Sequence, residues 1–223
     1  MMNRSSKTIR RMFATICGTA ISVMGGGAFG AGPETIIDAW KSVAVPPAPE
    51  LVPVTLDGAR TALLILDMSA INCVEAKRPS CVRSLPHVRR LLDSARARRM
   101  LVVYSAGAAS STASPEPVAA LAPQAGEPMV RAPVDKFFRS DLEKMLADRN
   151  IDTVIVTGTS AEGAVLSTAT GAALRNIRAI VPVDGYSAID PFAELYTAWH
   201  LKNAPAAISR NVTLTRTALI TLR

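Results

Sequence analysis

The chain has 223 residues, of which 49% are hydrophobic, 4% aromatic and 19% charged. This length and apolar content suffice for one domain with a sizeable core, and they exclude collagen-like, coiled-coil and disordered proteins. The net charge of +7 comes largely from residues 1–30, which hold four basic residues and no acid, leaving 21 basic and 18 acidic residues elsewhere. Because no basic run is interleaved with aromatics, we expect no nucleic-acid partner.

Residues 1–30 have the pattern of a bacterial signal peptide. Arg10-Arg11-Met12-Phe13 precedes an apolar, glycine-rich stretch that ends in small residues. The paired arginines resemble a twin-arginine export signal, but Ile9 stands where that signal prefers Ser or Thr, so ordinary secretion stays open. We expect cleavage after Gly30, a periplasmic or secreted protein, and no membrane attachment after cleavage. The alternative, an uncleaved anchor, is disfavoured because the apolar stretch is short.

Residues 31–60 form a proline-rich arm, which we expect to be extended because proline cannot pair within a central strand. The residue pattern changes at residue 61, where the predicted domain, residues 61–223, begins. Four short apolar runs follow that are rich in β-branched residues and do not alternate with polar ones: 62–66, 100–104, 153–156 and 179–183. Runs of this kind are typical of buried parallel strands.

Segments with helical periodicity lie among these runs, at 88–99, 141–149, 163–174 and 192–201. Ser140 and Glu143 have the spacing of a capping box at the start of the second helix. Repeated alternation of strand and helix predicts an α/β fold with helices on both faces of a mostly parallel sheet. Residues 107–128, rich in Ala, Ser and Pro, could form a flap over a site.

The two cysteines outside the leader, Cys73 and Cys81, could form a disulfide in an oxidising compartment. The alternative is that Cys73 is a nucleophile, because it follows Asp67 closely. A thiol nucleophile needs a base, and neither histidine of the mature chain is near Cys73 in sequence, so we favour the disulfide.

Polar residues follow the apolar runs, at the places where parallel α/β sheets bind ligands. Asp67 ends the first run, Lys136 precedes a predicted helix, and residues 158–165 join the third strand to a helix. We expect these three connections to converge on one crevice. Asn72 and Tyr104 could also face it.

At these positions the sequence resembles the isochorismatase-like hydrolases, the cysteine hydrolase superfamily of nicotinamidases, N-carbamoyl amidases and isochorismatases. The resemblance covers residues 60–222 and rests on five stretches: 62–68, 136–142, 153–158, 165–169 and 183–184. It implies a three-layer α/β/α sandwich and subunits that pair as a homo-oligomer. In the amidases an Asp, a Lys and a Cys form the catalytic triad, and Asp67 and Lys136 match the first two.

The resemblance also shows what differs here. Ala164 occupies the position of the nucleophilic Cys, which removes the thiol that the amidase mechanism requires. The peptide bond between Ser160 and Ala161 corresponds to the family's cis peptide, which aims backbone N–H groups at an oxyanion. The Asp-x-His arrangement of the zinc-dependent members is missing after Tyr104, so we expect no metal, and no cofactor is expected either.

True isochorismatases also lack a Cys at this position and hydrolyse a vinyl ether, with the Asp as general acid. We therefore expect a hydrolase that acts on a small organic molecule without a cysteine nucleophile, with Asp67 as general acid or base and Lys136 as its electrostatic partner. Glu162 could contact the ligand, or it could only interact favourably with the dipole at the start of a helix. The alternative is a catalytically inactive member that binds a small molecule.

Overall fold

The computed structural model describes residue 32, residues 35–107 and residues 116–223 of the chain. The predicted leader, residues 1–30, lies outside the described residues, as does part of the predicted flap. The chain divides into two compact parts, Met1–Val45 and Pro46–Arg223, each of which is treated by itself.

The described part of the first unit contains one short helix, α1 (Ile36–Ala39). Thr35 caps it, because its hydroxyl donates to Asp38 Oδ2 over 2.7 Å and its backbone N–H donates to the same oxygen over 2.9 Å. The large apolar side chains here are exposed: Ile36, Ile37, Trp40, Val43 and Val45. The arm predicted to be extended therefore includes one helical turn. No helix in the described ranges is long and apolar enough to span a bilayer.

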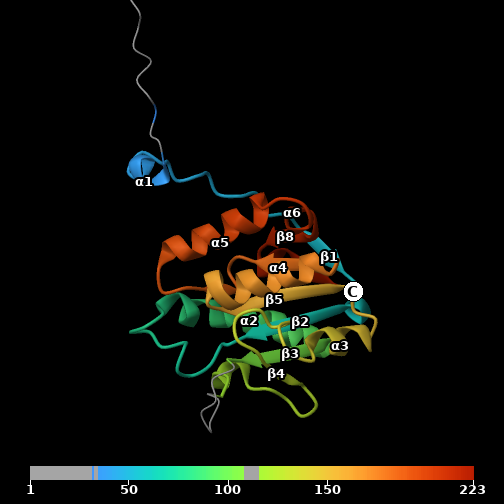
Figure 1. Ribbon diagram of the computed structural model, residues 1–223. Helices are drawn as coiled ribbons and strands as arrows, with labels where there is room; N and C mark the ends of the chain where they lie inside the picture. The colour runs from blue at the N-terminus through green and yellow to red at the C-terminus, as the bar shows by residue number, and fades with distance from the viewer. Residues whose placement is uncertain (1–31, 33–34, 108–115) are drawn as a thin grey trace, which may run out of the picture. The chain divides into compact units, whose positions relative to one another are not determined.

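Seven strands of the second unit form one sheet, in which every pair is parallel (Figure 1). The order is β4 (Met129–Arg131), β3 (Leu101–Ala106), β2 (Thr61–Leu66), β5 (Thr153–Thr159), β6 (Arg178–Pro182) and β8 (Val212–Thr215), with β7 (Tyr186–Ser187) pairing the end of β5. A separate parallel pair joins β1 (Val54–Leu56) to β9 (Ile220–Leu222). The predicted parallel α/β fold is confirmed.

The helices of this unit are α2 (Pro79–Ala97), α3 (Leu142–Ala147), α4 (Leu166–Leu174), α5 (Pro191–Asn203) and α6 (Ala207–Asn211). One turn of π-helix, Ala161–Val165, leads from β5 into α4. Short 3₁₀ turns occupy Gly58–Arg60, Ala119–Leu121 and Thr217–Leu219.

Alternate side chains of the central strand β2 serve two different cores, because successive side chains of a strand point to opposite faces. Leu64 and Leu66 pack in a cluster with residues of α3, α4 and α5. Leu63 and Ile65 pack in a second cluster with residues of α2, β1 and β9. The sheet is thus the middle of three layers, and both of its faces are covered. Figure 1 shows α4 and α5 side by side on one of them.

The start of α3 differs from the predicted capping box. Asp141 is the N-cap residue, and the Ser140 hydroxyl instead accepts from the Leu142 N–H over 3.1 Å and donates to the carbonyl oxygen of Lys136. Glu143 does not reach back to the cap, because its carboxylate accepts a hydrogen bond from Arg175. Ser140 therefore links α3 to the segment that carries Lys136.

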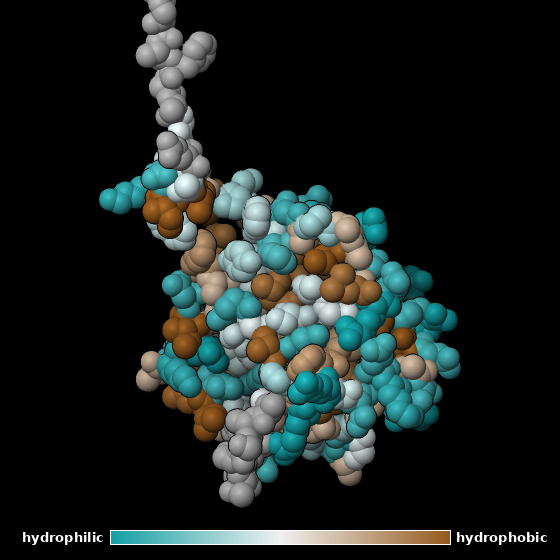
Figure 2. Space-filling model, in the orientation of Figure 1, coloured by the Kyte–Doolittle hydropathy of each residue, from teal (hydrophilic) through white to brown (hydrophobic). Residues whose placement is uncertain are grey.

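The surface of this unit carries both polar and hydrophobic side chains. Figure 2 shows hydrophobic side chains scattered among polar ones on the face seen there. Several large exposed apolar residues lie on α5 or just before it: Ile189, Phe192, Tyr196 and Trp199. The spacing of three and four residues places them along one side of the helix.

Gly158, near the end of β5, sits at a point of very close backbone approach. Its φ is +135°, and a Cβ atom there would lie 2.2 Å from the carbonyl oxygen of Leu66. We expect Gly158→Ala to lower the free energy of unfolding by more than about 3 kcal/mol, because overlap adds to backbone strain. Urea unfolding of the two proteins measures this.

Gly126→Ala is the matched control, since Gly126 also has a positive φ, +89°, but a Cβ there meets nothing within 4 Å. It should cost only about 1 kcal/mol. Equal losses in the two variants would contradict the close approach at Gly158.

Candidate active site

Asp67 and Lys136 form an ion pair at the carboxyl edge of the sheet, the edge at which the parallel strands end. Lys136 Nζ lies 2.8 Å from Asp67 Oδ2 and donates to the carbonyl oxygens of Ala132 and Pro133 over 3.1 and 3.0 Å. All three ammonium hydrogens thus have an acceptor. The Lys136 side chain is 0% exposed, which rules out the alternative of a solvated surface charge.

The Asp67 carboxylate is held on both of its oxygens. Ser105, on β3, donates its hydroxyl to Asp67 Oδ1 over 2.8 Å, while Lys136 occupies Oδ2. Asn72 donates its side-chain amide to the backbone carbonyl oxygen of Asp67 over 3.0 Å. Asp67 has a φ of +54°, and its side chain is 17% exposed, so the carboxylate is fixed and still reaches the surface.

Sequence reasoning missed Ser105. The signal was available in principle, because the apolar run at 100–104 ends beside it and parallel neighbours end at the same edge. The register aligns Ser105 with Leu66, the residue before Asp67. What the sequence could not supply was that β3, rather than another strand, is the neighbour of β2 on that side.

The connection after β5 corrects one prediction. The cis peptide bond lies between Thr159 and Ser160, not between Ser160 and Ala161. β5 runs three residues past the predicted end at 156, through Thr159, where it pairs with Ser187 of β7. The π-helical turn then begins directly, with Ala161 fully buried.

Within that turn, Ala164 is buried and Glu162 is exposed. Ala164, at 4% exposure, belongs to the same apolar cluster as Leu66, Phe137 and Ala161. The register also sets Leu66 beside Gly158. The three connections that carry Asp67, Lys136 and the 158–165 segment therefore meet at one edge of the sheet, as expected, whereas Glu162 points to the outside.

Tyr104 does not face this crevice, so its prediction as a ligand contact is wrong. Its side chain lies in the cluster on the α2 side of the sheet, and its hydroxyl accepts from Arg96 Nη2 over 3.2 Å. Burial raises the pKa of Tyr104 well above its ordinary value. Burial would also raise the pKa of Glu127, but hydrogen bonds from Arg96 and the Gln124 N–H outweigh it and lower that pKa. Tyr104 is thus part of a structural ion-pair network.

Cys73 and Cys81 are joined by a disulfide, with their Cα atoms 5.1 Å apart. It ties the loop after Asp67 to the first turn of α2. Neither sulfur is then a free thiol. Among residues 32, 35–107 and 116–223, no three His, Cys, Asp or Glu side chains gather as a metal site would require.

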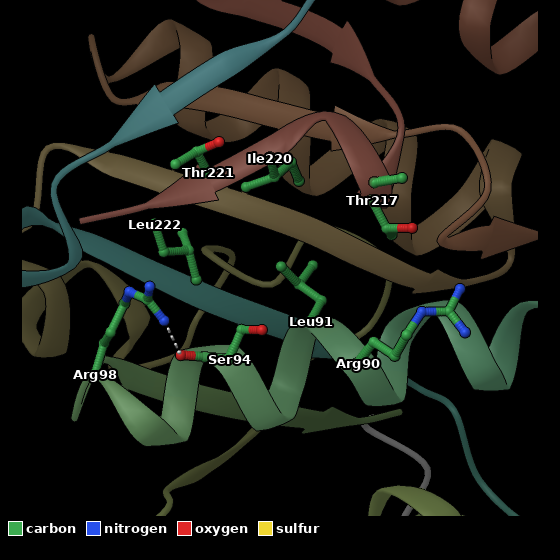
Figure 3. A pocket seen from close by; sticks show the side chains of 9 residues that line it. Arg90, Leu91, Ser94, Arg98, Thr217, Ile220, Thr221 and Leu222 are labelled. Atoms are coloured by element: carbon green, nitrogen blue, oxygen red, sulfur yellow. Dashed lines mark hydrogen bonds between the residues drawn. The ribbon is translucent and has the colours of Figure 1, made fainter.

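A pocket of about 360 Å³ lies elsewhere, between α2 and the C-terminal segment. Figure 3 shows Arg90 and Ser94 of α2, and Arg98 directly after it, on one side and Ile220 and Leu222 of β9 on the other. None of the predicted site residues lines it. The candidate active site is therefore defined by the ion pair at the carboxyl edge rather than by this hollow.

The chain belongs to the isochorismatase family, since the model of the isochorismatase domain matches residues 61–213. A search of curated protein sequences gave no match. The matched range includes both Asp67 and Lys136.

Solved structures show the same fold. A cysteine hydrolase from Pseudomonas syringae pv. phaseolicola 1448A is 23% identical, with a TM-score of 0.65, over 76% of this chain and 94% of its own. N-carbamoylsarcosine amidase from Thermoplasma acidophilum is 22% identical, with a TM-score of 0.61, over 71% and 96%. Nicotinamidase from Staphylococcus aureus is 16% identical, with a TM-score of 0.62, over 71% and 99%.

Breaking the ion pair from either side should destabilise the protein. We expect Lys136→Met and Asp67→Asn each to lower the free energy of unfolding by about 3 kcal/mol, because each leaves a buried group without its partner. The double variant should lose clearly less than the sum of the two, since nothing remains uncompensated. A double-mutant cycle by urea unfolding measures this coupling.

The exposed pair Lys144 and Asp148 on α3 provides the control, because its side chains are 73% and 55% exposed. Its coupling should not exceed about 0.5 kcal/mol. If the losses at Asp67 and Lys136 simply add, the two side chains do not depend on each other.

Proposed function

We propose that this protein is a hydrolase of small organic molecules that works without a cysteine nucleophile. By the sequence resemblance, Ala164 stands where the cysteine hydrolases carry their thiol, and a methyl group cannot attack a carbonyl. Two further observations support the proposal. Cys73 and Cys81 are bonded to each other, and the Asp67–Lys136 pair is complete without a third member.

The role of Asp67 follows from its hydrogen bonds, which carry this proposal. Each carboxylate oxygen accepts from a fixed donor, Lys136 or Ser105, which is the pattern of an ionised carboxylate. In that form Asp67 is a general base that takes a proton from water as the water attacks an electrophilic carbon, and it then gives that proton to the leaving group as the bond between that group and the carbon breaks. Lys136 offsets charge that develops nearby.

Hydrolysis of an enol ether would use the same pair in the other protonation state. Asp67 would first take up a proton and then donate it to the enol carbon, after which water adds to the resulting oxocarbenium ion and the hemiketal splits into an alcohol and a ketone. This route is compatible with Ala164, because it needs no nucleophilic side chain. This route requires one of the two donors on the carboxylate, Lys136 or Ser105, to give way to the added proton.

The alternative function is a catalytically inactive member that binds a small molecule in the same crevice. The observation that favours it is again Ala164, because the thiol is the group whose loss ends amidase chemistry. The two functions differ in turnover, not in the presence of a ligand site.

The test is product formation from a panel of small amides, carbamoyl compounds and enol ethers. We expect turnover by the protein without residues 1–30 and at least a hundredfold loss in Asp67→Asn, the typical contribution of a general base. Circular dichroism establishes that the variant is folded.

Asp93→Asn is the control, because Asp93 is an exposed carboxylate on α2, paired with Arg89; it should leave turnover unchanged. Turnover that survives in Asp67→Asn would refute the assigned role. A folded wild-type protein that binds members of the panel but converts none would favour the binding function.

We also propose that the protein is exported, as its leader predicts. The disulfide between Cys73 and Cys81 supports this, because such bonds persist in oxidising compartments. The denatured protein without its leader should show no alkylatable thiol before reduction and two afterwards.

Replacing both cysteines by serine should lower the free energy of unfolding by about 2.5 kcal/mol on the chain-entropy model. Accumulation of the chain in the cytoplasm with its leader uncleaved would contradict the proposal of export.

A further inference from the structure

Three buried side-chain atoms have no hydrogen-bond partner within the described ranges: Ser69 Oγ, Arg78 Nε and Ser187 Oγ. All three belong to the carboxyl edge. Ser69 and Arg78 lie in the loop from β2 to α2, and Ser187 pairs with Thr159 at the end of β5. A buried polar group without a partner costs about 1–3 kcal/mol, so folded proteins contain few. Their concentration at this edge leaves polar side-chain groups there for a bound ligand to pair with.

Of the three groups, the Arg78 guanidinium is the one whose burial without a partner costs most, because it is charged. Arg78 is 8% exposed, and its Nε has no hydrogen-bond partner among the residues that the structure describes. Arg96, also largely buried, shows the usual solution, because it pairs with Glu127 and donates to Tyr104. A guanidinium cannot shed its proton, so burial without an anion is unfavourable.

The surroundings of Arg78 suit an anion. Arg78 is the N-cap residue of α2, a helix of 19 residues whose dipole places a partial positive charge at this end. Pro79, the first residue of the helix, has no N–H, and the Cys81 N–H donates to the carbonyl oxygen of Arg78 over 3.0 Å. Ser80, in the first turn, donates its hydroxyl to the carbonyl oxygen of Ala188 over 2.9 Å, which ties this helix end to the segment of Ser187. Glu194, the acid next to that segment, is engaged by the Ala188 N–H over 2.8 Å.

The same loop begins at Asp67, so the anion site and the proposed general base share one connection. In a parallel β–helix–β unit the helix starts where the preceding strand ends, which sets the N-terminus of α2 at the edge that carries Asp67. The Asp67 carboxylate is already paired with Lys136, so it is not the anion that balances the charge of Arg78.

We propose that Arg78, with the Ser187 hydroxyl and the N-terminus of α2, binds a carboxylate group of the small molecule that enters this crevice. The free Nε favours a carboxylate, because Nε–H and one Nη–H together form the side-on fork that matches its two oxygens. That this molecule is also the substrate rests on the proposed function. The carboxylate site itself does not.

The experiment compares carboxylates with their neutral amides by isothermal titration calorimetry on the protein without its leader. The probes are benzoate with benzamide and pyruvate with pyruvamide. We expect at least one carboxylate to bind about tenfold or more tightly than its amide, the worth of a charge-assisted hydrogen bond. Arg78→Gln should abolish this preference. Arg83→Gln, which changes an exposed arginine of the same helix, should keep it.

Asp67→Asn separates this inference from the proposed function, because it should lose turnover but keep the preference for the carboxylate. Equal binding of carboxylates and amides by the wild-type protein would overturn the inference, as would a preference that survives in Arg78→Gln. If that variant does not fold, Arg78→Lys decides, since lysine keeps the charge but loses the fork. A tenfold weaker carboxylate affinity supports the inference, and an unchanged affinity overturns it.

Discussion

A lysine that is wholly buried keeps its charge only while an anion and other acceptors surround it, and Lys136 meets this condition at the carboxyl edge of the sheet. Its ammonium group joins Asp67, which follows β2, to the carbonyl oxygens of Ala132 and Pro133, which follow β4. Its backbone N–H donates to Thr168 of α4 over 3.1 Å. One residue therefore connects the segments that follow two strands to a helix, and these bonds fix the position of the Asp67 carboxylate.

The layers of this fold could be read from the sequence because its central strands are buried on both faces. The four apolar runs fall within or overlap β2, β3, β5 and β6, whereas the short strands β4, β7, β8 and β9 were not predicted. Strands of two to four residues carry too little pattern, and partners distant in the chain define them. α2 begins at Pro79, nine residues before the predicted start, because it continues through Pro86. Pro86 is exposed, so the helix carries this proline on its solvent side.

The site was predictable to the extent that chemistry follows directly after a strand. Asp67 and the 158–165 segment meet that condition, and the resemblance added Lys136. Ser105 also follows a predicted strand directly, but only the pairing of β3 with β2 shows that it reaches Asp67. Arg78 could not be found in this way, because what distinguishes it is a missing partner. Ser105 reaches the site because β3 lies beside β2. Arg78 stands out because burial separates its guanidinium group from water. Neither property is present in a linear sequence.

Stability alone is a poor explanation for the Asp67–Lys136 pair. Removing two charges from water costs about as much as their attraction returns, so apolar residues would fill the same space at least as well. Asp67 also adopts a left-handed backbone conformation, which costs free energy in any residue with a side chain. Ala164, by contrast, fits its apolar cluster without strain or an unsatisfied group. The fold thus bears a cost at the carboxylate and none at the alanine, which is the distribution expected if the chemistry of this edge resides in the charged pair and the water it can activate.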